Sequence, residues 1–423
     1  MPSDRDEISL RSRAPIAHPR TGRSDAPRLR VGVVGCGGRG TGAAADAVES
    51  APNVEIYAMG DLFRDRLQTS VEQLQKHASE GFNVPQERRF SGFDAYEGVL
   101  ETDIDVVILA TPPHYRPRQL RAAVEAGTHV FFEKPVAVDP SGAKHVLETG
   151  RMAEKKGLSL VTGTIYRRQD NFVEGVRRLH DGQIGDPIAG QAFYLTGPVW
   201  QRARKPGMSD MEWQCRNWYH FTWLSGDHIV EQFVHNLDTI NWAMQSHPVE
   251  ATATGGRQSR VDPSYGHIYD HFSVVYTYPN DVQVRAMCRQ IERATPNISN
   301  RIEGTEGRID LNPGKTTIRD NDGIPVFEME KGEKVDEDPY VTEHTDLVES
   351  IRQGEPINEA EQIAHSTLTG ILGREAAYTG QTITWDEIMA ADELALGPDA
   401  YEFGDATIPP VAQPGTTTLQ RSR

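Results

Sequence analysis

Short apolar runs alternate with amphipathic stretches from residue 29 to about residue 164. The first run is Leu29–Val34, which ends in glycines. Further runs of the kind that form buried strands cover Val54–Met59, Asp105–Ala110, His129–Phe132 and Leu158–Thr162. Helical patterns lie between them, at Gly42–Ser50, Arg118–Ala126 and Ser141–Lys156. Strands that alternate with helices predict an α/β unit, in which helices cover a parallel sheet.

The pattern changes after residue 165. Segments that alternate between apolar and polar positions follow one another without crossover helices, at Ile188–Thr196, Ile268–Tyr278 and Val282–Cys288. Residues 279–281, Pro-Asn-Asp, are typical of a hairpin turn, so these strands are predicted to form an antiparallel sheet. Helical patterns return at Val341–Arg352 and Glu359–Thr379. The second half is therefore predicted to be an α+β unit.

These patterns divide the 423 residues into four parts. Residues 1–28 are polar and predict a disordered lead-in. Residues 29–164 form the α/β domain, residues 165–400 the α+β domain, and residues 401–423 a tail rich in Pro, Thr and Gly. A chain of this length normally contains more than one domain.

Composition narrows the class of protein. Hydrophobic residues make up 37% of the chain and charged residues 25%, and no apolar stretch approaches the ~20 residues that cross a bilayer. The net charge of −17 disfavours nucleic acid, whose phosphates this surface would repel. Three scattered cysteines provide no disulfide framework, and no signal peptide is visible, so we expect a cytoplasmic protein. A removed export signal would leave the same pattern.

A glycine-rich loop, Gly-Cys-Gly-Gly-Arg-Gly, directly follows the first strand and precedes a helix. Gly35 permits a tight turn, Gly37 lets a pyrophosphate approach the backbone, and Gly40 allows the helix to pack closely on the strand. The free N–H groups at the start of the helix bind the anion. The loop, including Gly38 and Arg39, therefore predicts a dinucleotide-binding site.

Asp61 ends the second predicted strand, 21 residues after Gly40. A carboxylate at this place accepts hydrogen bonds from the ribose hydroxyls and repels a 2′-phosphate, which favours NAD over NADP. Arg64 and Arg66 lie nearby and soften this preference. NAD is the predicted cofactor, with NADP as the alternative.

Two later strand ends add residues to the predicted cofactor site. Thr111, Pro112 and His114 follow one apolar strand, and Glu133 and Lys134 follow the next. Ligands of doubly wound sheets bind outside the carboxyl ends of the strands, so these residues are predicted to face the dinucleotide. For Glu133 and Lys134, an ordinary solvated turn is the competing interpretation.

A helix is predicted from Ser225 or Asp227 to about Met244, with one apolar stripe. The opposite face carries two imidazoles and two carboxylates, from His228, Glu231, His235 and Asp238. This face has three interpretations: a solvated surface, an acid/base platform beside the nicotinamide, or a divalent metal site. The acid/base platform without a metal is the preferred hypothesis, with Glu231 orienting an imidazole.

The substrate site is predicted from a small set of polar and aromatic residues. Tyr166 and Arg168 follow the boundary between the two halves, and Trp218 can stack on the apolar face of a sugar ring. His228 and His235 complete the set. For the aromatic residues, burial in the core is the competing interpretation.

The glycine loop, Ala-Thr-Pro-Pro-His at 110–114, Glu-Lys-Pro at 133–135, and the pattern acid-x-x-x-His-x-x-Asp within 226–238 occur in this order. In these motifs, and in layout from residue 29 to about 390, the chain resembles the Gfo/Idh/MocA oxidoreductases. The resemblance implies a Rossmann domain followed by a domain with a large open, mainly antiparallel sheet, which commonly forms the interface of a homo-oligomer. It also implies NAD(P)-dependent oxidation or reduction of a secondary carbinol of a sugar or polyol.

Carried over by position, Lys134 matches the family lysine that contacts the nicotinamide ribose and the substrate hydroxyl. His235 matches a histidine often proposed as acid/base, and Glu231 occupies a position where the family more often has aspartate. The resemblance therefore implies Lys134, His235 and Glu231 as catalytic residues. The sequence leaves open whether Lys134 or His235 is the base.

The first functional hypothesis is an NAD(P)-dependent oxidoreductase that acts on a secondary hydroxyl of a sugar, polyol or glycoside. The expected partners are a small carbohydrate or polyol substrate and further copies of the chain in a dimer or tetramer, with no nucleic acid and no membrane. The alternative is a redox-neutral, NAD-dependent enzyme that cleaves a glycoside through a transient keto-sugar. A third hypothesis, from another class, is a non-catalytic NAD sensor on the same scaffold.

Overall fold

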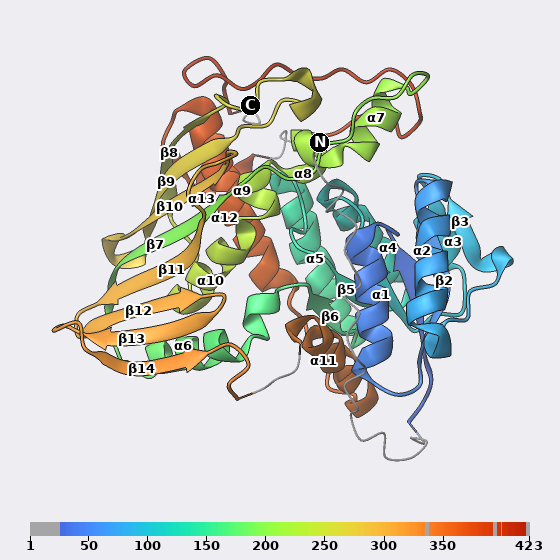
Figure 1. The fold of residues 1–423 in the computed structure, drawn as a ribbon, viewed down its shortest axis with the longest axis horizontal. Helices are drawn as coiled ribbons and strands as arrows, with labels where there is room; N and C mark the ends of the chain where they lie inside the picture. The colour runs from blue at the N-terminus through green and yellow to red at the C-terminus, as the bar shows by residue number, and fades with distance from the viewer. Residues whose placement is uncertain (1–25, 335–337, 392–395, 399, 420–423) are drawn as a thin grey trace.

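The computed structural model describes residues 26–334, 338–391, 396–398 and 400–419. Two sheets dominate it, one at each side of the view in Figure 1, with helices between them. Most of the predicted lead-in, residues 1–25, lies outside the described residues. No helix within the described ranges is long and apolar enough to cross a bilayer.

The first sheet has six strands, all parallel, in the order β3-β2-β1-β4-β5-β6. Its strands are β1 Leu29–Val34, β2 Val54–Asp61, β3 Arg89–Ser91, β4 Val106–Leu109, β5 His129–Phe132 and β6 Leu160–Thr162. The helices that follow them are α1 Gly38–Ser50, α2 Arg64–His77, α3 Ala95–Leu100, α4 Arg116–Ala126 and α5 Pro140–Lys156. The strand order reverses between β1 and β4, which opens a crevice at their carboxyl ends where such sheets bind ligands.

The predicted parallel sheet is confirmed, with two differences. The helix α1 begins at Gly38, inside the glycine loop and four residues before the predicted start, because its first turn contains glycines that carry no apolar signal. The sequence pattern missed α2, β3 and α3. In α2 only Leu67, Ser70, Val71 and Leu74 are buried, so its apolar stripe is short and weak.

The second sheet has nine strands in the order β14-β13-β12-β11-β7-β10-β9-β8-β15. They are β7 Pro187–Thr196, β8 Glu250–Gly256, β9 His271–Tyr278, β10 Val282–Gln290, β11 Asn297–Gly304, β12 Gly307–Asn312, β13 Lys315–Asp320, β14 Pro325–Glu330 and β15 Ile383–Thr384. Every neighbouring pair is antiparallel except β7 and β10, which run parallel. The prediction of a large, mainly antiparallel sheet is confirmed. The carboxyl ends of β7 and β10 meet at one edge.

Further helices accompany this sheet. They are α6 Asp170–His180, α7 Asp210–Arg216, α8 Thr222–Ser225, α9 His228–Glu231, α10 Val234–Met244, α11 Pro339–Gln353, α12 Ala360–Thr379 and α13 Trp385–Ala390. Short 3-10 helices are η1 Ser79–Gly81, η2 Gln86–Arg88, η3 Pro113–Tyr115, η4 Ile165–Arg167, η5 Trp218–His220, η6 Pro263–Tyr265 and η7 Pro279–Asp281. The last of these is the predicted turn between β9 and β10, with Asn280 at φ 62°.

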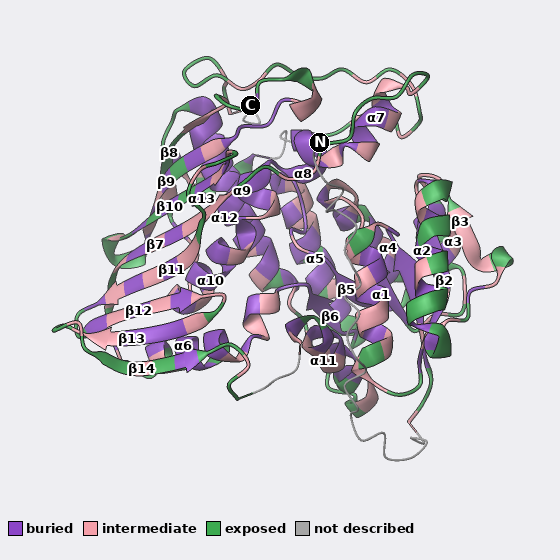
Figure 2. Cartoon of the chain, in the orientation of Figure 1, coloured by how far each residue is buried: buried purple, intermediate pink, exposed green. Residues whose placement is uncertain are grey.

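The helix α12 joins the two halves of the molecule. It packs against α5 on one side and against β8 and α10 on the other, so nearly all of its residues are buried (Figure 2). Its buried residues include polar ones such as Thr367, Thr369 and Arg374, which form hydrogen bonds inside the protein. Both halves therefore share one continuous interior at this helix.

Two later segments return to the first half. The helix α11 packs along α1, and its Leu347 and Val348 belong to the core beneath the parallel sheet. Residues 400–419 contain no helix or strand, yet they make contacts that the predicted tail did not suggest. Tyr401 bonds to His114 through its hydroxyl at 2.8 Å, and Phe403 stacks on Phe63 at 5.9 Å.

The buried side chain of Arg374 offers a test of how α12 joins the two halves of the molecule. Its guanidinium, fully buried on α12, donates to the carbonyls of Val138 and Gly226 at 2.7 and 3.1 Å and to Glu375 at 2.7 Å. Arg374→Met leaves these acceptors without a donor, so we expect it to lower the free energy of unfolding by about 3–5 kcal/mol in urea denaturation. Arg121→Met, which removes an exposed pair with Glu125, is the matched control and should change it little. A loss for Arg374→Met no larger than the control's would contradict this role.

Candidate active site between the two sheets

The glycine loop has the close contacts that its sequence predicts. Gly35 has φ +94°, and a Cβ there would lie 2.6 Å from the backbone of Ala110 and Thr111. A Cβ on Gly40 would lie 1.8 Å from the carbonyl oxygen of Gly35. Side chains are therefore excluded at both places. Gly37, by contrast, faces open space apart from Arg66, so its backbone can be approached by a ligand.

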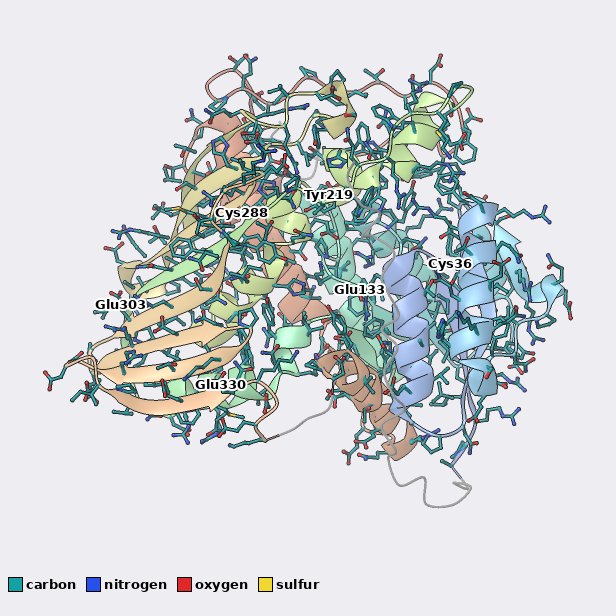
Figure 3. The ribbon with its side chains drawn as sticks, in the orientation of Figure 1. Cys36, Glu133, Tyr219, Cys288, Glu303 and Glu330 are labelled. Carbon is teal, nitrogen blue, oxygen red and sulfur yellow. The ribbon has the colours of Figure 1, made fainter. Side chains whose placement is uncertain are left out.

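A cavity of about 530 Å³ lies over this loop. Of the residues predicted to bind the cofactor, its lining includes Gly35, Gly37, Gly38, Arg39, Asp61, Thr111 and Pro112. Gly40 lies under the loop, and His114, Glu133 and Lys134 lie outside the lining. In Figure 3, Cys36 marks the loop, while Glu133 and Tyr219 lie in the middle of the molecule. The cavity over the glycine loop, together with the residues around Glu133, Lys134 and Glu231, forms the candidate active site.

Asp61 bonds to the backbone of the site. Its two carboxylate oxygens accept hydrogen bonds from the N–H groups of Cys36 and Phe63, both at 2.7 Å. Burial raises the pKa of Asp61, while these hydrogen bonds oppose the rise. The carboxylate thus links the first turn after β2 to the glycine loop, and Asp61 lines the cavity.

Arg39, within the glycine loop, forms ion pairs with three carboxylates. Its guanidinium pairs with Glu133, with Asp46 at 3.1 Å and with Glu343 of α11 at 3.1 Å. Burial raises the pKa of Asp46 to about 6, against the opposing effect of Arg39. Burial likewise raises the pKa of Glu343. Arg39 and Glu133, which were predicted to face the dinucleotide, are therefore bonded to each other, and α11 braces the loop from behind.

Lys134 reaches from the end of β5 to the second domain. Its Nζ donates to the backbone carbonyl of Glu231 at 2.8 Å and lies 3.8 Å from the Oε2 of the same residue. Burial raises the pKa of Glu231, although the nearby Lys134 lowers it. Burial and the charge of Lys134 both lower the pKa of His235, so its imidazole is neutral at neutral pH. Tyr166 lies beside it, with ring centroids 5.4 Å apart.

The predicted continuous helix is wrong at its middle. The helix α9 ends at Glu231 and α10 begins at Val234, because the N–H of Phe233 bonds back to the carbonyl of His228, and the N–H of His235 bonds to that of Gln232. The Glu231 carbonyl therefore accepts its hydrogen bond from the Nζ of Lys134. Breaks of this kind are frequent at functional sites. Sequence periodicity did not reveal it, since the group that bonds to the Glu231 carbonyl comes from a lysine 97 residues away.

The polar face predicted for this helix is not a solvated surface. His228 is buried and bonds through Nδ1 to Asp227 at 2.9 Å, with its ring against Phe272. Asp238 is buried in an ion pair with Arg167 at 2.8 Å. Only Glu231 and His235 are brought to Lys134. No group of three or more His, Cys, Asp or Glu side chains in the described part of the chain is placed to hold a metal ion.

Three other predicted site residues have contacts that do not involve Lys134. Arg168 pairs with Asp346 at 3.0 Å and with Glu359 at 2.7 Å, which occupies its guanidinium. Burial lowers the pKa of His114 to about 4, and its ring packs against Trp223. Trp218, which was predicted to contact the substrate, lines the cavity over the glycine loop, next to Trp200.

Two tyrosines that the sequence analysis did not select, Tyr194 and Tyr219, have a pKa that burial raises, and both lie close enough to Glu231 for its charge to add to the rise. Burial raises the pKa of Tyr194 to about 12, and the charge of Glu231 adds to the rise. The Tyr219 hydroxyl accepts a hydrogen bond from Gln290 at 2.6 Å, and Gln290 also donates to Gln232. Tyr194 and Gln290 lie at the carboxyl ends of the parallel pair β7 and β10. The only sequence signal for them was the end of each predicted strand.

The two halves of the chain match two descriptions of one family. Residues 29–164 match an oxidoreductase family with an NAD-binding Rossmann fold, and residues 174–310 match the GFO/IDH/MocA C-terminal domain. A glycosyl hydrolase family 109 protein of Streptomyces coelicolor is 31% identical over 170 residues, which span 40% of this chain but only 34% of that protein. The myo-inositol 2-dehydrogenase of Thermotoga maritima is 23% identical over 85% of this chain and its own full length.

A solved structure supports the fold over most of the chain. The aldose-aldose oxidoreductase from Caulobacter crescentus, complexed with glycerol, superposes with a TM-score of 0.66 at 18% identity. It covers 85% of this chain and all of the other. From the matches to both halves, and from the glycine loop and the paired sheets, the chain belongs to the Gfo/Idh/MocA family of oxidoreductases.

Proposed function

We propose that the protein is an NAD-dependent oxidoreductase that transfers a hydride between the cofactor and a secondary hydroxyl of a sugar, polyol or glycoside. The observation that carries the proposal is the contact of Lys134 with Glu231, which places an ammonium, a carboxyl and the imidazole of His235 at the carboxyl edge of the parallel sheet. The relative from Thermotoga maritima that matches over its full length is named a myo-inositol 2-dehydrogenase.

The residues of the site fit such a reaction. The glycine loop and Asp61 would hold NAD in the cavity that they line, and the cofactor would supply the hydride acceptor for the carbinol carbon. The carbinol carbon gives up a hydride readily only if the hydroxyl proton leaves as well and a carbonyl forms, so a base is needed. The neutral imidazole of His235 takes this proton, and the Lys134 ammonium donates a hydrogen bond to the developing alkoxide. Glu231 holds Lys134 in place through its carbonyl and its carboxylate.

The alternative function remains a redox-neutral cleavage of a glycoside, in which the hydride returns to the sugar. The relative from Streptomyces coelicolor favours it, since that protein is named a glycosyl hydrolase family 109 protein. The same Lys134 and His235 would then form the keto-sugar transiently and reverse the step. The two functions differ in net NADH.

Three further assignments belong to this proposal. The cofactor domain comprises residues 29–164 and the substrate domain residues 165–400. The outer face of the nine-stranded sheet joins copies of the chain in a dimer or tetramer. All three cysteines are free and buried, which suits a reducing, cytoplasmic compartment.

Absorbance at 340 nm, the band of reduced nicotinamide, separates the two functions. With NAD and a panel of inositols and hexoses, the dehydrogenase produces NADH in proportion to the oxidised substrate. With aryl glycosides, the redox-neutral enzyme releases the phenol and no net NADH. Failure of both assays across the panel would count against hydride chemistry at this site.

Lys134→Ala is expected to lower kcat by about 10³-fold, because both the hydrogen bond to the alkoxide and the contact with Glu231 are lost. NAD binding should largely persist, since the lining of the cavity over the glycine loop does not include Lys134. Steady-state kinetics and a fluorescence titration with NAD measure the two effects. Lys156→Ala, on the far end of α5, is the control and should keep full activity; near-normal turnover of Lys134→Ala would exclude the proposed role.

The depressed pKa of His235 predicts the pH dependence. Its neutral form is the competent base, and burial with the charge of Lys134 keeps this form populated below the usual value of 6.5. The profile of log kcat/KM should therefore stay flat from pH 8 to 6.5 and fall only at lower pH. If protonation of His235 causes this fall at low pH, the Glu231→Gln variant should show the same fall, which is the acid limb of the profile. An acid limb centred above pH 6.5 would contradict this assignment.

A further inference from the structure

The second domain supplies one wall of the cavity over the glycine loop. Residues 200–218 contribute Trp200, Arg202, Cys215 and Trp218 to its lining. Facing them, α2 contributes Arg66. The cavity is thus enclosed by both halves of the chain at the end marked by Asp61, which is the end predicted to hold the adenosine ribose.

This wall is held in place by contacts with the first domain and within itself. Arg216 pairs with Asp65 of α2 at 3.0 Å. The N–H of Arg202 donates to the Asn217 side chain at 2.8 Å, and its carbonyl accepts from Trp213 Nε1 at 3.0 Å. Trp213 belongs to an apolar cluster that includes Phe63, directly after the end of β2. The backbone of Arg202 therefore has a defined place at the mouth of the cavity.

Arg66 and Arg202 form no direct ion pair within the described part of the chain. Among the described residues, no carboxylate lies within ion-pairing distance of the Arg66 or Arg202 guanidinium. Arg66 donates one hydrogen bond, to the backbone carbonyl of Arg216 at 3.3 Å. Its Nη1 lies 3.9 Å from where a Cβ on Gly37 would be, so it reaches the loop that receives the anion. Burial lowers the pKa of Arg66, and the charges of Arg202 and Arg216 add to this effect, with Asp61 opposing.

We propose that Arg66 and Arg202, one from each domain, form a two-guanidinium site that binds a phosphate group of the dinucleotide. Guanidinium groups bind phosphate oxygens through paired, charge-assisted hydrogen bonds, and a bound anion relieves the repulsion between the two cations. The indoles of Trp200 and Trp218 lie 5.8 Å apart beside Arg202 and offer an aromatic surface to the adenine. The inference rests on the proposed function for the identity of the ligand, and it adds second-domain residues to the cofactor site.

Two phosphate sources fit this chemistry. One is the pyrophosphate, which the glycine loop draws to the neighbouring N–H groups. The other is the 2′-phosphate of NADP, which would lie near Asp61 on the adenosine ribose. Both are met by the same pair of guanidinium groups. If the pair binds the pyrophosphate, loss of Arg202 weakens the binding of every dinucleotide. If it binds the 2′-phosphate, loss of Arg202 leaves the affinity for a nucleotide without this group unchanged.

Binding of cofactor fragments tests the site without any turnover. Isothermal titration calorimetry is carried out with ADP-ribose and with 2′-phospho-ADP-ribose, on the full chain and on Arg202→Ala. We expect Arg202→Ala to weaken at least one of the two by roughly 10- to 100-fold, as for a hydrogen bond to a charged group. Equal loss for both fragments assigns the pyrophosphate, and loss confined to the second assigns the 2′-phosphate.

Arg204→Ala is the matched control. Arg204 lies two residues further along, pairs with Asp210 at 2.6 Å and does not line the cavity, so its loss should leave both affinities unchanged. Arg202→Lys keeps the charge and should recover part of the affinity. Unchanged affinity of Arg202→Ala for both fragments, with tight binding by the unmodified chain, would overturn the inference. If the unmodified chain binds neither fragment, the proposed function fails first.

Discussion

The buried guanidinium of Arg374 ties together the two chain segments that carry the proposed reaction centre. It donates to the carbonyl of Val138, shortly after Lys134, and to the carbonyl of Gly226, shortly before Glu231. A buried guanidinium cannot lose these acceptors cheaply, because water is not there to replace them. Arg374 of α12 therefore links the segment after β5 to the residues before α9, and these two segments carry Lys134 and Glu231.

Burial also sets the chemistry of that contact. One environment raises the pKa of the Glu231 carboxyl and lowers the pKa of the His235 imidazole, because it disfavours the charged form of each. Compared with water, the site therefore favours a protonated carboxyl at Glu231 and a neutral imidazole at His235. A neutral base beside an ammonium is the arrangement that proton abstraction from a hydroxyl requires. The break between α9 and α10 belongs to the same arrangement, since it frees the Glu231 carbonyl for Lys134.

The dinucleotide cavity extends this coupling between the domains. One wall comes from the glycine loop and Asp61, and the other from Trp200, Arg202 and Trp218. A ligand that contacts both walls stabilises their relative position by its binding free energy. The C-terminal segment adds to the same edge, because Phe403 stacks on Phe63, next to Asp61. Cofactor binding and the position of the second domain are in this way linked.

The sequence alone determined the parallel sheet, the mainly antiparallel sheet and the glycine loop, because strand periodicity and glycine spacing are signals within a few neighbouring residues. The roles of Lys134, Glu231 and His235 stay predictions, although the structure brings the three together. Only the tertiary structure decided that His228 bonds to Asp227 in the core, that the helix breaks after Glu231, and that Trp218 lines the cavity over the glycine loop. The helix break and the place of Trp218 involve groups that meet from distant parts of the chain. Asp227 and His228 are neighbours, but the pattern of apolar positions did not record that the imidazole would be buried.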